Sequence, residues 1–69
     1  MMNKTRYFIY LLDHGDVVGA MTYKSESRDI EMVTDRVCAL ISEPLYARYK
    51  PPYDTVVVRS GEQVTRRRR

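Results

Sequence analysis

The chain of 69 residues carries a formal net charge of +3, with twelve Lys and Arg against nine Asp and Glu. Four of the arginines, Arg66 to Arg69, stand together at the C-terminal end, and without them eight basic residues face nine acidic ones, a net charge of −1. A domain that lies on nucleic acid gathers its basic residues on a folded surface. This composition instead places much of the positive charge in one short run, which argues against that class.

A chain of this size forms one domain and buries only about 60% of the surface that its unfolded form exposes. One cysteine, Cys38, and one histidine, His14, exclude an intrachain disulfide and a Cys/His zinc site, so we expect no cofactor and no metal. Association with another protein, or with a second copy in a homodimer, is the remaining source of extra stability. The lone thiol suits a reducing cytoplasm, and no apolar run is long enough for a signal peptide or a membrane span, so we expect a cytoplasmic protein without a membrane partner.

Two strands and a tight turn are predicted at the start of the chain. Residues 7–12 form a continuous apolar and aromatic run, which is typical of a central strand buried on both faces. Residues 17–24 are predicted to form the second strand, and Gly15 supplies the positive φ that the hairpin turn needs. This turn predicts that Phe8 lies opposite Met21 in the hairpin.

A helix and a third strand are predicted to follow. Ser25 and Ser27 are candidate N-caps, and Pro44 stops the helix near Ser42. Residues 53–59, rich in valine, are predicted to form the third strand. Five apolar residues recur at helical spacing and form one stripe: Ile30, Val33, Val37, Leu40 and Ile41.

These elements predict an α+β fold in the order β-β-α-β. The sheet is expected to have three antiparallel strands in the order 2-1-3, with one main helix on one face. Residues 1–60 would form this single domain. Residues 61–69 show no apolar periodicity and are predicted to be a flexible basic tail.

The predicted sheet has two apolar faces but one helix to cover them. The register places Ile9 and Leu11, with Val18 and Ala20, on an aliphatic face that matches the helix stripe. The other face is left uncovered, and its aromatic and Met side chains are of the types enriched at the cores of protein interfaces. The residues predicted to bind a partner are Phe8, Tyr10, Met21 and Tyr23.

The expected function is therefore non-enzymatic: a regulator or inhibitor that docks on another protein through this aromatic face or through the acidic helix. No catalytic residue is predicted, because His14 lies in a turn with no nucleophile near it in sequence. In architecture alone, a β-β-α-β domain of this size resembles some small phage-encoded proteins that bind and inhibit a host enzyme.

The alternative is a small RNA- or DNA-binding module. Ring faces on an open sheet stack nucleotide bases, and a cationic tail holds phosphates. The acidic side chains of the predicted helix argue against this alternative, because they would repel a phosphate backbone. The residues that would contact nucleic acid, or an acidic protein surface, are Arg6, Arg66, Arg67, Arg68 and Arg69.

Overall fold

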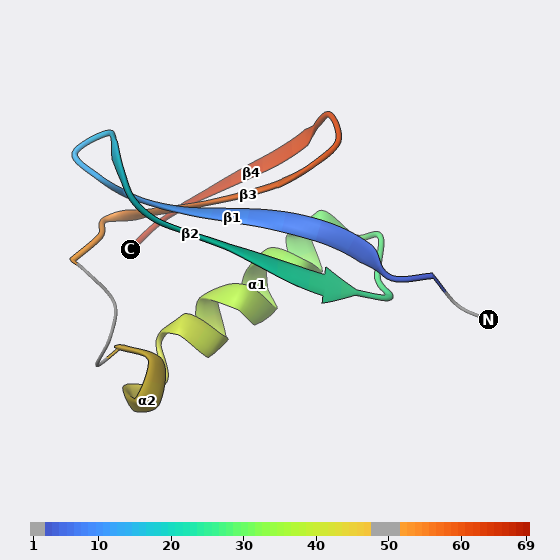
Figure 1. The fold of residues 1–69 in the computed structure, drawn as a ribbon, viewed down its shortest axis with the longest axis horizontal. Coiled ribbons are helices and arrows are strands. Elements are labelled where there is room, and N and C mark those ends of the chain that lie inside the picture. Colours follow the sequence, from blue (N-terminus) through green and yellow to red (C-terminus); the bar gives the residue numbers. More distant parts are fainter. Residues whose placement is uncertain (1–2, 48–51) are drawn as a thin grey trace.

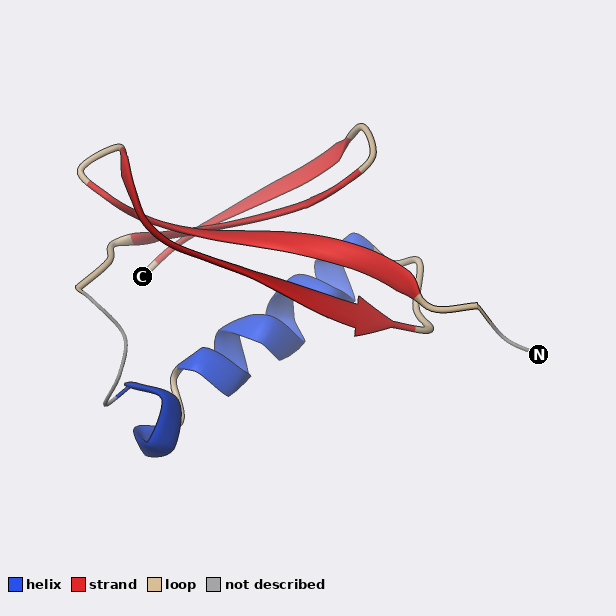
Figure 2. Cartoon of the chain, viewed as in Figure 1, coloured by secondary structure: helices blue, strands red, loops and turns tan. Residues whose placement is uncertain are grey.

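The computed structural model describes residues 3–47 and 52–69 as one antiparallel sheet with its helices on one side (Figure 1). The strands lie in the order β2-β1-β3-β4, so the first strand is central as predicted, and the α+β class is confirmed (Figure 2). Neither described helix is long and apolar enough to cross a bilayer. The elements are β1 (Thr5–Asp13), β2 (Asp16–Ser25), α1 (Ile30–Ile41), α2 (Pro44–Ala47), β3 (Thr55–Ser60) and β4 (Gln63–Arg68).

The fourth strand corrects the predicted sheet, which had three. Residues 61–69 were predicted to be a flexible tail, whereas most of them form β4, an antiparallel partner of β3. Gly61, with a φ of 59°, makes the turn between the two strands. The strand was missed because its inward-facing positions, Gln63, Thr65 and Arg67, are polar, so the sequence shows no apolar alternation.

The register of the first hairpin is also different from the prediction. Near the turn, Leu12 pairs with Val17 as expected, but the register shifts between Leu11 and Leu12. This β-bulge moves all the later pairs by one residue, so that Leu11 lies opposite Gly19. The Leu11 side chain covers that glycine so closely that an added Cβ would lie 3.3 Å from its Cδ1. Because side chains alternate between faces, the shift transfers the side chains of β2 beyond the bulge to the opposite side of the sheet.

The core lies between the sheet and α1, as the predicted helix stripe requires. Tyr7, Ile9 and Leu11 of β1 face the helix and are almost fully buried. On α1, the predicted stripe is confirmed, with Ile30 and Leu40 partly buried at its margin. The other buried apolar residues of this core are Val33, Val37, Ile41, Tyr53, Val56 and Val58.

The start of α1 differs from the prediction in its capping residue. Asp29 is the N-cap, and its carboxylate accepts hydrogen bonds from the backbone N–H groups of Glu31 (3.1 Å) and Met32 (3.4 Å). Ser25 and Ser27, predicted as caps, accept hydrogen bonds within the loop before the helix instead. An aspartate at this position also places negative charge at the positive end of the helix dipole, which stabilises the helix.

A buried pair of hydroxyl groups joins β4 to α1. The Thr34 Oγ donates to the carbonyl oxygen of Ile30 at 2.7 Å and lies 2.6 Å from the Thr65 Oγ. Since a hydroxyl has one proton, Thr65 must be the donor in the bond between the two threonines. This interaction fixes β4 against the helix inside the core, because Thr34 is fully buried and Thr65 is 8% exposed.

Candidate functional site: the open face of the sheet

The side of the sheet opposite the helix carries an apolar centre surrounded by basic side chains. Directly paired residues of antiparallel strands lie on the same face of a sheet. Phe8 lies on the side away from the helix and pairs with Thr22 and Arg59, so these residues and their alternate neighbours lie on that side as well. We call this surface the open face. Its residues are Arg6, Phe8, Tyr10 and Leu12 of β1, Val17, Ala20, Thr22 and Lys24 of β2, Thr55, Val57 and Arg59 of β3, and Val64, Arg66 and Arg68 of β4.

Two aromatic rings stand at the centre of the open face. Phe8 is 40% exposed, an unusual exposure for a phenylalanine in a central strand, and Tyr10 is half-buried. Val57 lies beside Tyr10 on β3 and is buried beneath its neighbours. A shallow depression of about 300 Å³ lies on this surface, lined by Tyr10, Leu12, Val17, Val57, Arg59 and Arg66.

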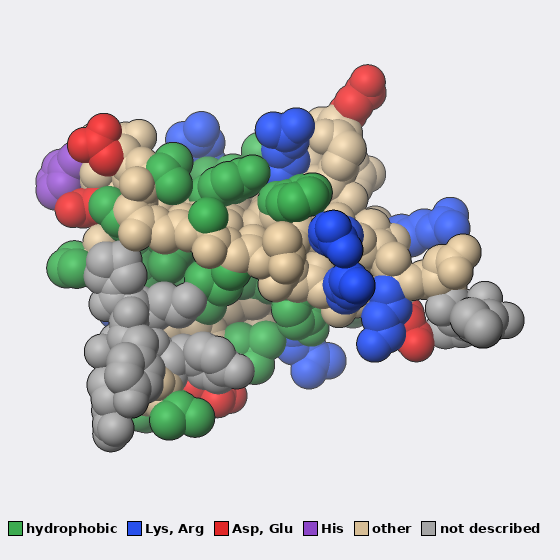
Figure 3. Space-filling view, viewed as in Figure 1, with side chains coloured by type: hydrophobic (Ala, Val, Ile, Leu, Met, Phe, Trp, Pro, Cys, Tyr) green, Lys and Arg blue, Asp and Glu red, His purple; other side chains and the backbone are tan. Residues whose placement is uncertain are grey.

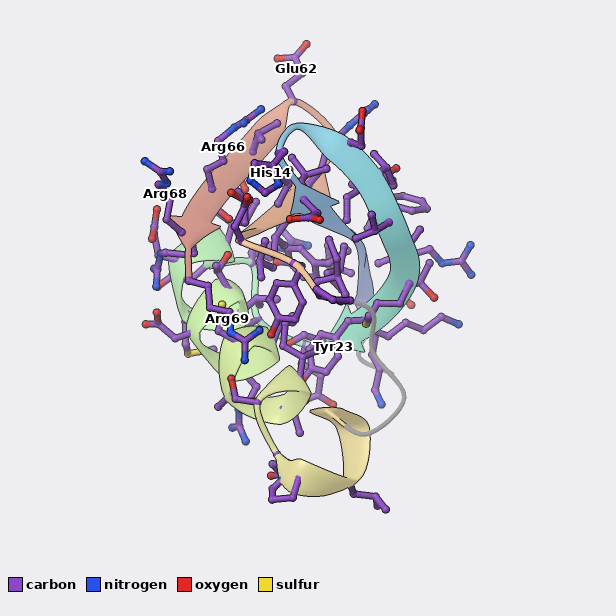
Figure 4. All side chains as sticks on the ribbon, turned by 90° about the vertical axis from the view of Figure 1, so that its left-hand side faces the viewer. His14, Tyr23, Glu62, Arg66, Arg68 and Arg69 are labelled. Carbon is purple, nitrogen blue, oxygen red and sulfur yellow. The ribbon has the colours of Figure 1, made fainter. Side chains whose placement is uncertain are left out.

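Five basic residues among the described strands lie on the same face. Arg59 is directly opposite Phe8, and Arg66 lies one strand beyond the Tyr10–Val57 pair. Arg66 and Arg68 project outward from β4 (Figure 4), and basic side chains stand among hydrophobic ones on the sheet side of the molecule (Figure 3). Arg6 and Lys24 pair with each other at the far end of the β1–β2 hairpin.

Acidic side chains do not occupy any paired position of the open face in the described strands. Asp13 and Asp16 pair at the hairpin turn, one position beyond the open-face pair of Leu12 and Val17, so they face the other side. Glu62 stands at the tip of the β3–β4 turn (Figure 4). In the described part of the chain Arg67 is the Lys or Arg residue that forms ion pairs, so the basic residues of the open face have no carboxylate within ion-pair distance. Together with the stronger effect of the hydrogen bond from the His14 backbone, the charge of Arg68 nevertheless helps to lower the pKa of the nearby Asp54.

Arg67 and Arg69 do not belong to this surface, although the sequence grouped all four terminal arginines. Arg67 faces α1, where its guanidinium donates to Glu31 at 2.7 Å and to Asp35 at 2.5 Å. These hydrogen bonds to carboxylates raise the pKa of Arg67 above its usual value. The guanidinium of Arg69 lies over the ring of Tyr53, 4.7 Å from its centroid. Of the residues predicted to contact an anionic partner, the open face thus brings together Arg6, Arg66 and Arg68.

The four residues predicted to form one partner-binding surface are divided between the two sides of the sheet. Phe8 and Tyr10 lie on the open face, whereas Met21 and Tyr23 pair with the inward-facing Ile9 and Tyr7 and pack against the core. Tyr23 lies on the inner side of the sheet (Figure 4). The prediction that these four point the same way is wrong, because the bulge at Leu11/Leu12 shifts the register by one residue.

Met21 and Tyr23 line an apolar groove between β2 and α1. The groove has a volume of about 220 Å³ and is open to one side because α1 packs nearer to β3 and β4 than to β2. Leu40 of the helix forms part of its wall. The groove is therefore a second, separate surface with a different chemical character from the open face.

Sequence reasoning missed Lys24 and Arg59 as members of the basic surface. Arg59 follows Val57 by two residues, and this spacing was a usable signal once strand β3 was recognised. Lys24 was not assigned to either face, and the predicted register, which lacked the bulge, did not pair it with Arg6 as the structure does. Both residues are exposed.

The turn residues Asp13, His14 and Asp54 form a small polar cluster at one end of the sheet. Asp54 accepts hydrogen bonds from the His14 backbone N–H at 3.0 Å and from the Thr55 hydroxyl at 2.8 Å. These hydrogen bonds lower the pKa of Asp54 below its usual value, with the backbone bond as the larger cause. His14 itself is exposed and adopts a positive φ of 52°. The cluster ties the first hairpin turn to the start of β3.

Cys38 lies beside the core on α1 and is half-buried. Burial raises the pKa of its thiol, an effect that the nearby Arg67 partly opposes. A raised pKa leaves less thiolate at neutral pH, so this residue lacks the activation of a catalytic nucleophile.

Comparison with known proteins gives no relative for this chain: no family model matches it, and neither a curated protein nor a solved structure is significantly similar.

Proposed function

We propose that the protein is a non-enzymatic nucleic-acid-binding module and that the phosphate backbone of its ligand lies on the open face. The observation that carries this proposal is the charge of that face. Five basic side chains surround the rings of Phe8 and Tyr10, and no carboxylate occupies a paired position there. A surface of one charge sign attracts a ligand of high and regular opposite charge, and nucleic acid is such a ligand.

The acidic residues of the helix do not oppose this binding as the sequence suggested. Glu31 and Asp35 lie on the other side of the sheet, where Arg67 is bound to both. At physiological ionic strength, exposed charges more than about 8 Å apart are largely screened from each other. The net charge of −1 for the first 65 residues is the sum of charges on the open face and on the helix side of the molecule. A ligand bound to the open face interacts mainly with the charges of that face.

Docking on another protein, the first expectation from the sequence, was placed on the aromatic face or on the acidic helix. The first of these placements assumed that Phe8, Tyr10, Met21 and Tyr23 share a face. Because two of these residues lie on each side of the sheet, that combined surface does not support the function. The basic residues around Phe8 and Tyr10 favour the nucleic-acid alternative for the open face. We therefore place nucleic-acid binding ahead of protein docking.

The test is fluorescence anisotropy with a labelled 12-nucleotide single strand at several salt concentrations. The logarithm of the binding constant should fall with the logarithm of salt concentration by about 0.7 per phosphate contact, to a slope of roughly −3.5 if all five basic side chains engage. Arg66→Gln and Arg59→Gln should each weaken binding and reduce the slope by about 0.7.

Arg36→Gln is the matched control, because Arg36 is an exposed basic residue on α1, outside the open face. It should leave both the affinity and the slope unchanged. Equal losses in Arg36→Gln and Arg66→Gln would mean that binding depends on total charge, and the open face would then not be the site. Circular dichroism on each variant confirms that the sheet is intact.

A further inference from the structure

The open face has a second property besides charge, which is the spacing of its two rings. Phe8 and Tyr10 are alternate residues of the same strand, so their Cα atoms are about 6.8 Å apart at the usual rise of about 3.4 Å per residue. Consecutive bases in one strand of a duplex are separated by about 3.4 Å along the helix axis. Two neighbouring bases of a continuous stack therefore cannot each lie on one of these rings.

We infer that the open face takes an unpaired strand, with two neighbouring bases splayed apart and stacked on Phe8 and Tyr10. This inference rests on the proposed function and specifies its ligand. Only a single-stranded segment exposes the faces of its bases to side chains, because in a duplex those faces are covered by the next base pair. Stacking is tolerant of sequence, since every base has a π-face.

The positions of the basic residues fit this ligand. Arg59 lies across from Phe8 on β3, and Arg66 lies two strands away from Tyr10 on β4. Each ring thus has an arginine on the same side of it, at the same level of the sheet. With bases on β1, the phosphates of the same nucleotides would run over β3, which carries Arg59, and over β4, from which Arg66 projects (Figure 4).

The depression beside Tyr10 supports the same placement. It is lined by Tyr10, by the aliphatic residues Leu12, Val17 and Val57, and by Arg59 and Arg66. A lining of apolar residues and two arginines suits a base together with its phosphate, because the base is flat and weakly polar while the phosphate is charged. A carboxylate-rich protein surface would use the arginines but leave the rings and the apolar residues without a matching group.

The experiment compares four ligands of similar length with the intact protein, using the labelled strand as the reporter in competition. These are a 12-nucleotide oligothymidine, an abasic 12-mer with the same phosphates, a 12-base-pair duplex and polyglutamate. We expect the oligothymidine to bind at least about tenfold more tightly than the abasic strand, because each stacked base adds substantially to affinity. The duplex and polyglutamate should also bind more weakly than the oligothymidine.

Variants of Phe8 test whether its ring causes the preference for strands that carry bases. Phe8→Leu should lose about tenfold in affinity for oligothymidine and little for the abasic strand, whereas Phe8→Tyr should retain the preference for bases. Thr22→Val changes the partner of Phe8 on β2 without removing a ring and serves as the control. If Phe8→Leu does not fold, the comparison of ligands with the unaltered protein still decides the question.

The outcomes separate the two proposals. Equal affinity for the base-bearing and abasic strands would overturn base stacking and leave the proposed phosphate-binding function standing. Tighter binding of the duplex than of oligothymidine would likewise overturn the inference of an unpaired strand, while the proposed nucleic-acid binding would stand. Failure to bind any nucleic acid, with or without binding of polyglutamate, would overturn both.

Discussion

The hydrogen bond between the hydroxyl groups of Thr34 and Thr65 predicts that replacing either threonine by valine lowers stability by a different amount. Thr34→Val removes the acceptor of the Thr65 hydroxyl, which is almost fully buried and is left with an unsatisfied proton. In Thr65→Val the Thr34 hydroxyl still donates to the Ile30 carbonyl at 2.7 Å, so no buried hydrogen-bond donor is left without an acceptor. We therefore expect Thr34→Val to be the more destabilising of the two.

The magnitudes follow from the cost of a buried unsatisfied group. Thr34→Val should lower the free energy of unfolding by about 1–3 kcal/mol, and Thr65→Val by about 1 kcal/mol or less. The double variant replaces both hydroxyls by methyl groups of similar shape and should be nearly neutral. Adding Thr65→Val to the Thr34→Val protein should thus restore stability, which corresponds to a favourable coupling between the two sites.

Urea denaturation followed by circular dichroism measures all four proteins of this cycle. The melting temperature gives a second measure, and a loss of 1–3 kcal/mol corresponds to roughly 5–20 °C for a domain of this size. A coupling energy below about 0.5 kcal/mol would contradict the reasoning. It would mean that β4 does not hold Thr65 against α1 in solution.

Two further predictions concern the core and the first hairpin turn. Ile41→Ala on α1 should cost roughly 2–5 kcal/mol by lost burial and a cavity, whereas Met32→Ala on the same helix, at a residue 50% exposed, should be nearly neutral; similar melting temperatures would disprove the assigned helix phase. Folding lowers the pKa of Asp54, so its carboxylate stabilises the folded protein at pH values above its unfolded-state pKa of about 3.9. This stabilisation is lost as pH falls through the folded-state pKa. Urea midpoints of the unaltered protein should therefore fall more steeply than those of Asp54→Asn below about pH 4, and parallel profiles would show that the bond from His14 is not made.

Patterns of apolar residues made the centre of this fold predictable. The run at the start of the chain identified the central strand, and the stripe on α1 identified the apolar helix residues that pack into the core, because both patterns report the burial of apolar residues directly. Pro44 also marked the end of the helix, since the ring cannot be accommodated in a helix interior. These features depend on residues close together in sequence.

The remaining errors arose from long-range or irregular features. A bulge adds one residue at Val18 without any change in the apolar pattern, and this single residue moved Met21 and Tyr23 to the other side of the sheet. Strand β4 has inward positions filled by Thr65 and Arg67, whose partners Thr34, Glu31 and Asp35 lie more than thirty positions away. The basic open face depends on both features, because the bulge places Lys24 on it and β4 places Arg66 and Arg68 on it, so the sequence indicated only part of this surface.

The four consecutive arginines have a consequence for how β4 finds its alignment. A strand made of identical residues presents the same side chains after any displacement along its neighbour, so the tract from Arg66 to Arg69 carries no information about its own position. That information comes from the residues before it. Gly61 fixes the turn geometry, and Thr65 is the one buried residue of β4. The turn at Gly61 and the buried hydroxyl of Thr65 thus determine which arginines face outward and which face α1. Chemically identical residues acquire different surroundings only because of their positions relative to these two features.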